Sequence, residues 1–139
     1  MLSFLVVNRL RILITGSRSW PDGDMDKIEN VISEYVKKTT RAGDTITFVY
    51  GDCPTGVDSF IPKIALKLPM NRVVMQECYE ADWDKYGKSA GPKRNQQMVD
   101  SGADICMAFF HGASRGTYNC TYKAESAGIC VRRFNYNSL

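Results

Sequence analysis

The chain has 139 residues, of which 44% are hydrophobic and 24% are charged, and its formal net charge is +3. This composition predicts one globular domain over residues 1–139 and excludes disordered and collagen-like classes. The basic residues are spread out and form no stripe, which disfavours a nucleic-acid-binding protein. No apolar run reaches the roughly 20 residues that a membrane span requires, and residues 1–7 resemble no signal peptide. We therefore expect a cytoplasmic protein without membrane association.

The cysteine and histidine content disfavours a metal centre. An odd, scattered set of cysteines without a C-x-x-C motif predicts reduced and mostly buried thiols rather than a disulfide framework or a structural zinc site. These residues are Cys53, Cys78, Cys106, Cys120 and Cys130. His111 is the single histidine, so a His-based site is also disfavoured. We predict no metal, and no cofactor is firmly implied.

Short apolar runs alternate with segments of helical periodicity along the chain. The first expected strand, 11–15, ends at Gly16, and apolar positions 28, 31, 32, 35 and 36 have the spacing of an amphipathic helix with Asp22 and Asp24 as N-caps. In chain order there follow a strand at 45–50, a helix from about 58 to 68, a strand at 72–75, a helix from 91 to about 99, a strand at 105–109, a helix ending before Gly128, and a strand at 130–134. Pro62 is expected in the first turn of its helix.

This alternation predicts an α/β fold, namely a Rossmann-like, doubly wound parallel sheet of about five strands flanked by helices. Ligands of such sheets bind beyond the carboxyl ends of the strands. Glycine-containing loops follow the first, second and fourth expected strands. The strand order 3-2-1-4-5 makes these three strands neighbours, whereas 2-1-3-4-5 separates the fourth strand from the first. We therefore predict the order 3-2-1-4-5.

The loop at 112–117, between a strand and a helix, has the features of an anion site. Glycines let a backbone approach a phosphate closely, and a helix N-terminus offers unpaired N–H groups and a positive dipole end. Thr117 adds a hydroxyl, and Arg18, Arg94 and Arg115 are candidate guanidinium donors. The loops match neither G-x-G-x-x-G nor the P-loop, which disfavours hydride transfer and P-loop hydrolysis.

Five motifs in this order and spacing resemble the SLOG superfamily, in particular its YspA/YpsA-related (cpYpsA-like) branch of bacteria and phages. The motifs are Gly16-Ser17-Arg18-Ser19-Trp20, Gly51-Asp52-x-x-x-Gly56-Val57-Asp58, Ala81-x-Trp83, Ala90-Gly91-Pro92-Lys93-Arg94-Asn95-x-x-Met98 and Phe110-x-Gly112-x-x-x-Gly116-Thr117. The resemblance covers residues 11 to about 131 and leaves residues 1–10 outside.

The resemblance implies a Rossmann-like domain that binds a nucleotide or a nucleotide-derived ligand. Some members are LOG-type enzymes that cleave the N-glycosidic bond of nucleoside monophosphates, and others are similar to sensors or nucleotide-processing accessories. The family's phosphate loop maps onto Gly112, Gly116 and Thr117, and the arginine of its helix motif maps onto Arg94. The expected ligand-binding residues are Gly16, Ser17, Arg18, Gly51, Asp52, Gly56, Asp58, Arg94, Asn95, Gly112, Ser114, Arg115, Gly116 and Thr117.

The chain departs from the LOG-type pattern at the catalytic glutamate, where it has Cys120. A thiol does not replace a carboxylate that stabilises an oxocarbenium-like state, so that activity is disfavoured. Asp52, Asp58 or Glu125 remain candidate carboxylates. Three alternatives stay open: a nucleotide-binding sensor or accessory, a nucleoside-monophosphate N-glycosidase or nucleotide hydrolase, and a phage-encoded ligand-sequestering or protein-interaction module.

Several aromatic residues have competing interpretations. Trp83 is expected to anchor its loop to the core rather than to stack on a base. His111 is expected to be a surface residue. Tyr118 and Tyr122, four positions apart on a helix, are typical of a packing or dimer face, and with apolar residues 4–7 they suit a homodimer.

Overall fold

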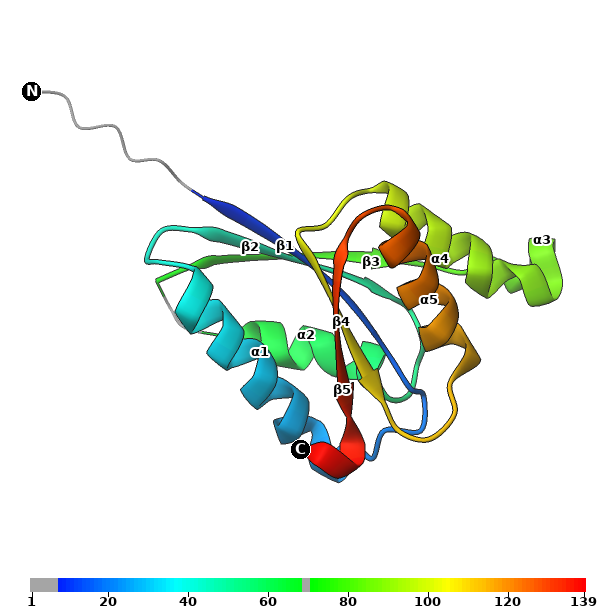
Figure 1. Ribbon diagram of the computed structural model, residues 1–139, viewed down its shortest axis with the longest axis horizontal. Helices are drawn as coiled ribbons and strands as arrows, with labels where there is room; N and C mark the ends of the chain where they lie inside the picture. The colour runs from blue at the N-terminus through cyan, green and yellow to red at the C-terminus, as the bar shows by residue number, and fades with distance from the viewer. Residues whose placement is uncertain (1–7, 69–70) are drawn as a thin grey trace, which may run out of the picture.

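The computed structural model describes residues 8–68 and 71–139 (Figure 1). Within them, five parallel strands form one sheet in the order β3-β2-β1-β4-β5. The strands are β1 (Arg9–Gly16), β2 (Thr45–Gly51), β3 (Val73–Tyr79), β4 (Ile105–Phe110) and β5 (Cys130–Asn135). The predicted α/β Rossmann-like fold and its strand order are confirmed.

Two pairs of helices cover the two faces of the sheet (Figure 1). α1 (Met25–Thr39) and α2 (Val57–Lys67) pack on one face through residues such as Ile32 and Ile64. α4 (Ala90–Asp100) and α5 (Arg115–Ser126) pack on the other through residues such as Met98 and Cys120. Residues 8–68 and 71–139 also contain three 3-10 turns: η1 (Asp22–Asp24), η2 (Gly87–Ser89) and η3 (Tyr136–Ser138). None of the helices in the described ranges is long and apolar enough to cross a bilayer.

Two elements differ from expectation. β3 extends to Tyr79 rather than ending at 75, because its polar second half still pairs with β2 up to Gly51. β3 is an edge strand with solvent-facing side chains, so an apolar pattern is not needed there. A single turn of helix, α3 (Trp83–Tyr86), then follows between the strand expected at 72–75 and the helix expected from 91.

Helix α2 and the helix ends bring further corrections. Pro62 is the sixth residue of α2, so its expected place in the first turn is wrong, and it offers no N–H to the carbonyl of residue 58. The helix begins at Val57, whose amide donates to the Ser17 carbonyl at 3.3 Å. Asp24 precedes α1, but its carboxylate accepts from the Tyr136 hydroxyl instead of capping. Gly128 follows α5 with φ +80°, as predicted.

All five cysteines are free, but the prediction that most are buried is wrong. Cys106 and Cys120 are buried between the sheet and α5, whereas Cys78 and Cys130 are exposed on the edge strands β3 and β5. Edge strands expose side chains that a central strand would cover, which explains the difference.

Candidate functional site

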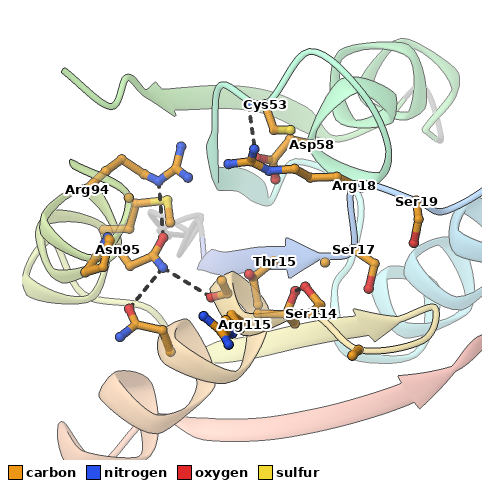
Figure 2. A pocket seen from close by; sticks show the side chains of 18 of the residues that line it. Thr15, Ser17, Arg18, Ser19, Cys53, Asp58, Arg94, Asn95, Ser114 and Arg115 are labelled. Atoms are coloured by element: carbon orange, nitrogen blue, oxygen red, sulfur yellow. Dashed lines mark hydrogen bonds between the residues drawn. The ribbon is translucent and has the colours of Figure 1, made fainter. Parts of the chain in front are cut away.

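A cavity of about 610 Å³ lies at the carboxyl ends of the central strands. This volume is within the range of ordinary small-molecule sites. Figure 2 shows Arg18, Cys53 and Asp58 on one side of it and Ser114 and Arg115 on the other, with the end of β1 between them. The lining residues come from the carboxyl ends or following loops of β1, β2 and β4, from the first residues of α2 and α5, and from the segment that runs from Trp83 to Met98.

One wall of the cavity is the N-terminus of α5. The Ser114 hydroxyl lies 2.6 Å from the Thr117 hydroxyl and does not cap the helix. The first amides of a helix have no intrahelical acceptor, and no acceptor among the described residues takes their place at 115–117. A Cβ on Gly116 would meet no atom within 4 Å. The open backbone of this turn therefore presents free N–H groups and a positive dipole end to the cavity.

The N-terminal half of α4 contributes a buried polar network. Arg94 is only 8% exposed; its Nη1 donates to Asp52 Oδ1 at 3.0 Å and its Nε donates to Asn95 Oδ1 at 3.1 Å. Asn95 Nδ2 in turn donates to the Gly116 carbonyl and to Asn119 Oδ1, both at 3.2 Å (Figure 2). Asn95 thus fixes α4 to the first turn of α5, and Arg94 is already paired with a carboxylate.

Asp58 supplies a carboxyl group to the cavity. Its Oδ2 accepts from the Cys53 amide at 3.2 Å. Burial raises the pKa of the Asp58 carboxyl, opposed by the nearby Arg94 guanidinium and the Cys53 amide. A Cβ on Gly51 would lie 2.7 Å from Arg94 Cζ and 2.8 Å from Asp58 Oδ2. Gly51 therefore makes the room in which these two side chains approach each other.

The loop after β1 joins the other two loops. The Ser17 amide donates to the Phe109 carbonyl at 3.0 Å, and the Ser17 hydroxyl accepts from the His111 amide at 2.9 Å. A Cβ on Gly56, whose φ is +72°, would lie 2.6 Å from the Arg18 Cα. Ser17 thus joins the loop after β1 to β4 and its following loop through its amide and its hydroxyl, and Gly56 lets the loop after β2 approach the Arg18 backbone.

Trp83 lies on the cavity wall rather than in the core, so its expected role as a core anchor is wrong. It is 46% exposed, and the Arg18 guanidinium lies over its ring at 5.8 Å from the centroid. The buried tryptophan is Trp20, which is 2% exposed and packs edge-on against Phe109 and Tyr136.

No family model matches the chain. It is 37% identical over 125 residues to the Gene 61 protein of Mycobacterium phage D29, and the alignment covers 89% of this chain and 95% of that protein. The chain belongs to the family of this Gene 61 protein.

Most of the residues expected to bind a ligand line one cavity in this member of the Gene 61 protein family. Ten of the fourteen do so: Gly16, Ser17, Arg18, Asp58, Arg94, Asn95, Ser114, Arg115, Gly116 and Thr117. The other four do not line it. Gly51 and Gly56 make room for neighbouring atoms, Asp52 pairs with Arg94, and Gly112 forms a turn with φ +66°.

The cavity also contains residues that were not predicted: Thr15, Ser19, Cys53, Trp83, Lys88, Gly91, Pro92, Met98, Ala113 and Asn119. Several of these residues fall inside the five motifs that resemble the SLOG superfamily, so the motifs could have indicated them. Lys88 and Asn119 lie outside the motifs, and no sequence pattern indicated them. Two residues weighed for enzyme chemistry lie outside the cavity, and the burial of Cys120 agrees with the buried thiol that the sequence predicts. Glu125 lies in the last turn of α5, paired with Arg133, and does not line the cavity. Cys120, at the glutamate position of the LOG pattern, is fully buried.

Tyr118 and Tyr122 are exposed on α5, at 59% and 73%. The homodimer face predicted from these two tyrosines stays a prediction. Residues 4–7, which were expected to contribute to it, lie outside the described residues. His111 is half-buried; its ring contacts Tyr136 and its Nδ1 lies 2.9 Å from the Ser19 hydroxyl.

Proposed function

We propose that this protein is a SLOG-type domain that binds a nucleotide or nucleotide-derived ligand, as a sensor or a nucleotide-processing accessory. The phosphate binds at the N-terminus of α5, and the sugar and base extend toward the loops after β1 and β2. The observation that carries this proposal is the uncapped first turn of α5, which opens into the cavity at Gly116.

The charges around the cavity support an anionic ligand. Arg18, Lys88 and Arg115 all line it, and none of them forms an ion pair with another described residue. Like charges that converge on one cavity repel each other, and an anion between them removes that cost. Arg94 lines the cavity, but its Nη1 and Nε already have acceptors, so we expect it chiefly to position Asp52 and Asn95 and to add positive field.

A thermal shift experiment tests binding. We expect at least one of the four ribonucleoside 5′-monophosphates to stabilise the protein, by about 2.7 kcal/mol at 100 times its Kd. Gly116→Val should abolish this shift, because its side chain projects into the space that the phosphate needs. Tyr122→Ala, on an exposed side chain outside the cavity, is the matched control and should keep the shift. No stabilisation by any of the four nucleotides, or an unchanged shift in Gly116→Val, would contradict the proposal.

One observation favours a second function, hydrolysis of the N-glycosidic bond or another bond of a nucleotide. Asp58 is a carboxyl group in the cavity whose pKa burial raises, and such a group can act as a proton donor nearer to neutral pH. Chromatography of nucleoside monophosphates after incubation with the protein separates the two functions. A binding protein returns the nucleotide intact, whereas a hydrolase releases free base or phosphate, and Asp58→Asn should then stop the release.

A further inference from the structure

Trp83 is held in place but left open to the cavity. Asp82 Oδ1 accepts from the Lys85 amide at 3.1 Å and so caps the single turn of α3. A Cβ on Gly91 would lie 3.2 Å from Trp83 Cη2, so one edge of the indole rests on the backbone of α4. Trp83 is the one aromatic side chain among the described residues that line the cavity. A large apolar ring that is fixed on one edge and half-exposed is suited to receive a planar partner.

Arg18 also lines the cavity, and its guanidinium lies over the Trp83 ring. Its guanidinium carbon lies 5.8 Å from the Trp83 centroid, and the side chain is exposed and forms no ion pair with another described residue. Two stacked layers at van der Waals separation need about 7 Å, so a movement of the flexible Arg18 by about 1 Å admits a planar ring. Guanidinium groups stack on aromatic rings, and bases stack on tryptophan.

We infer that Trp83 and Arg18 form a base clamp, in which an aromatic base inserts between the indole and the guanidinium. This inference rests on the proposed function and specifies its ligand. The ligand class is then a phosphorylated compound with an aromatic base, not a sugar phosphate. The phosphate lies at the N-terminus of α5 and the base lies at Trp83, and both line the same 610 Å³ cavity.

The contrast with Trp20 argues against a purely structural role. Trp20 is 2% exposed, donates its Nε1–H to the Asp24 carbonyl at 3.0 Å and packs against two rings. That is the environment of a tryptophan that anchors a loop to the core. Trp83 is 46% exposed and has a cation over its face instead.

Two probes that differ only by the base test the clamp. They are ribose 5-phosphate and whichever of the four ribonucleoside 5′-monophosphates binds most tightly, titrated by calorimetry. We expect Trp83→Ala to weaken the nucleotide by roughly 5- to 150-fold, the range for loss of one base–aromatic stack, and to change ribose 5-phosphate by less than about 2-fold. Trp83→Phe should retain most of the affinity, Arg18→Ala should lose less than Trp83→Ala, and the control Tyr122→Ala should bind both probes normally.

Tryptophan fluorescence gives an independent readout, because the chain has two tryptophans and only Trp83 lines the cavity. The nucleotide should quench the emission, ribose 5-phosphate should not, and Trp83→Phe should lose the quenching. Equal weakening of both probes by Trp83→Ala, or nucleotide binding that this variant leaves unchanged, would overturn the clamp while leaving nucleotide binding in place. Failure of every nucleotide to bind the wild-type protein would overturn the proposed function and the clamp together.

Discussion

The two sides of the cavity use glycine in opposite ways. On the side of β1 and β2, a Cβ on Gly16 or Gly56 would lie 2.7 Å from Val57 Cβ or 2.6 Å from the Arg18 Cα, respectively. On the side of β4 and α5, a Cβ on Gly112 or Gly116 would meet nothing within 4 Å. The first pair is needed because protein atoms already fill the space. The second pair leaves space open, and only Gly116 of the two lines the cavity.

This difference separates a side where loop backbones pack against one another from a side where the backbone stays open to the cavity. On the packed side, the loops after β1 and β2 contact each other, for example through the hydrogen bond from the Val57 amide to the Ser17 carbonyl. The open side leaves the first turn of α5 without a side-chain cap. A loop rich in glycine at a strand end therefore indicates close backbone approach, but the partner can be either a neighbouring loop or a ligand.

The largest effect is expected for Gly56→Ala, on the packed side. Its φ of +72° is unfavourable for alanine, and the new Cβ would overlap backbone atoms of Arg18. At φ +72° and ψ −148° the backbone lies in a region that essentially only glycine adopts, which costs alanine roughly 1–3 kcal/mol, and overpacking costs roughly another 1–3 kcal/mol. We therefore expect the unfolding free energy to fall by about 2–6 kcal/mol. Denaturant titration followed by circular dichroism measures this loss.

A matched control is Gly112→Ala. Gly112 also has positive φ, +66°, but its Cβ would meet nothing within 4 Å. This variant should lose only the backbone cost of roughly 1–2 kcal/mol. Equal losses in Gly56→Ala and Gly112→Ala would show that backbone conformation alone matters and that the two sides do not differ in packing.

An intermediate effect is expected for Arg94→Ala, which tests whether Arg94 belongs to the packed side. The substitution removes a buried guanidinium that donates to Asp52 and Asn95, and leaves Asp52 Oδ1 with only the Ala81 amide, at 3.4 Å, as donor. The Asp52 side chain is 35% exposed and can be rehydrated, so we expect a loss of about 1–3 kcal/mol in denaturant titration. Arg94→Lys keeps the charge without the forked geometry and should fall between alanine and wild type. An Arg94→Ala protein as stable as wild type would place Arg94 with the ligand-binding groups instead.

The sequence predicts the scaffold of the site better than the roles of its residues. Apolar periodicity predicts most of the strands and helices, and the three glycine loops predict the strand order, because only adjacent strands can bring such loops together. The pairing of Arg94 with Asp52 joins residues 42 positions apart, and no local pattern encodes it. The environment of Trp83 depends on its contact with Gly91 across two elements, so the sequence could not distinguish a cavity wall from a core anchor.

The smallest expected effect, and the one of opposite sign, is that of Gly116→Ala. Gly116 is the second residue of α5, and its backbone is not in the left-handed region. Alanine is favoured over glycine in a helix by roughly 0.5–1 kcal/mol, and the new methyl group contacts no protein atom beyond its chain neighbours and its own helix backbone. Denaturant titration should therefore show a gain of about 0.5–1 kcal/mol in unfolding free energy, while calorimetry should show weaker nucleotide binding, because the methyl group reduces the space in front of the α5 amides.

The same glycine-to-alanine change would thus destabilise the protein at Gly56 and stabilise it at Gly116. A loss of stability at Gly116 would mean that the open side is packed after all, and unchanged nucleotide affinity would mean that the phosphate binds elsewhere.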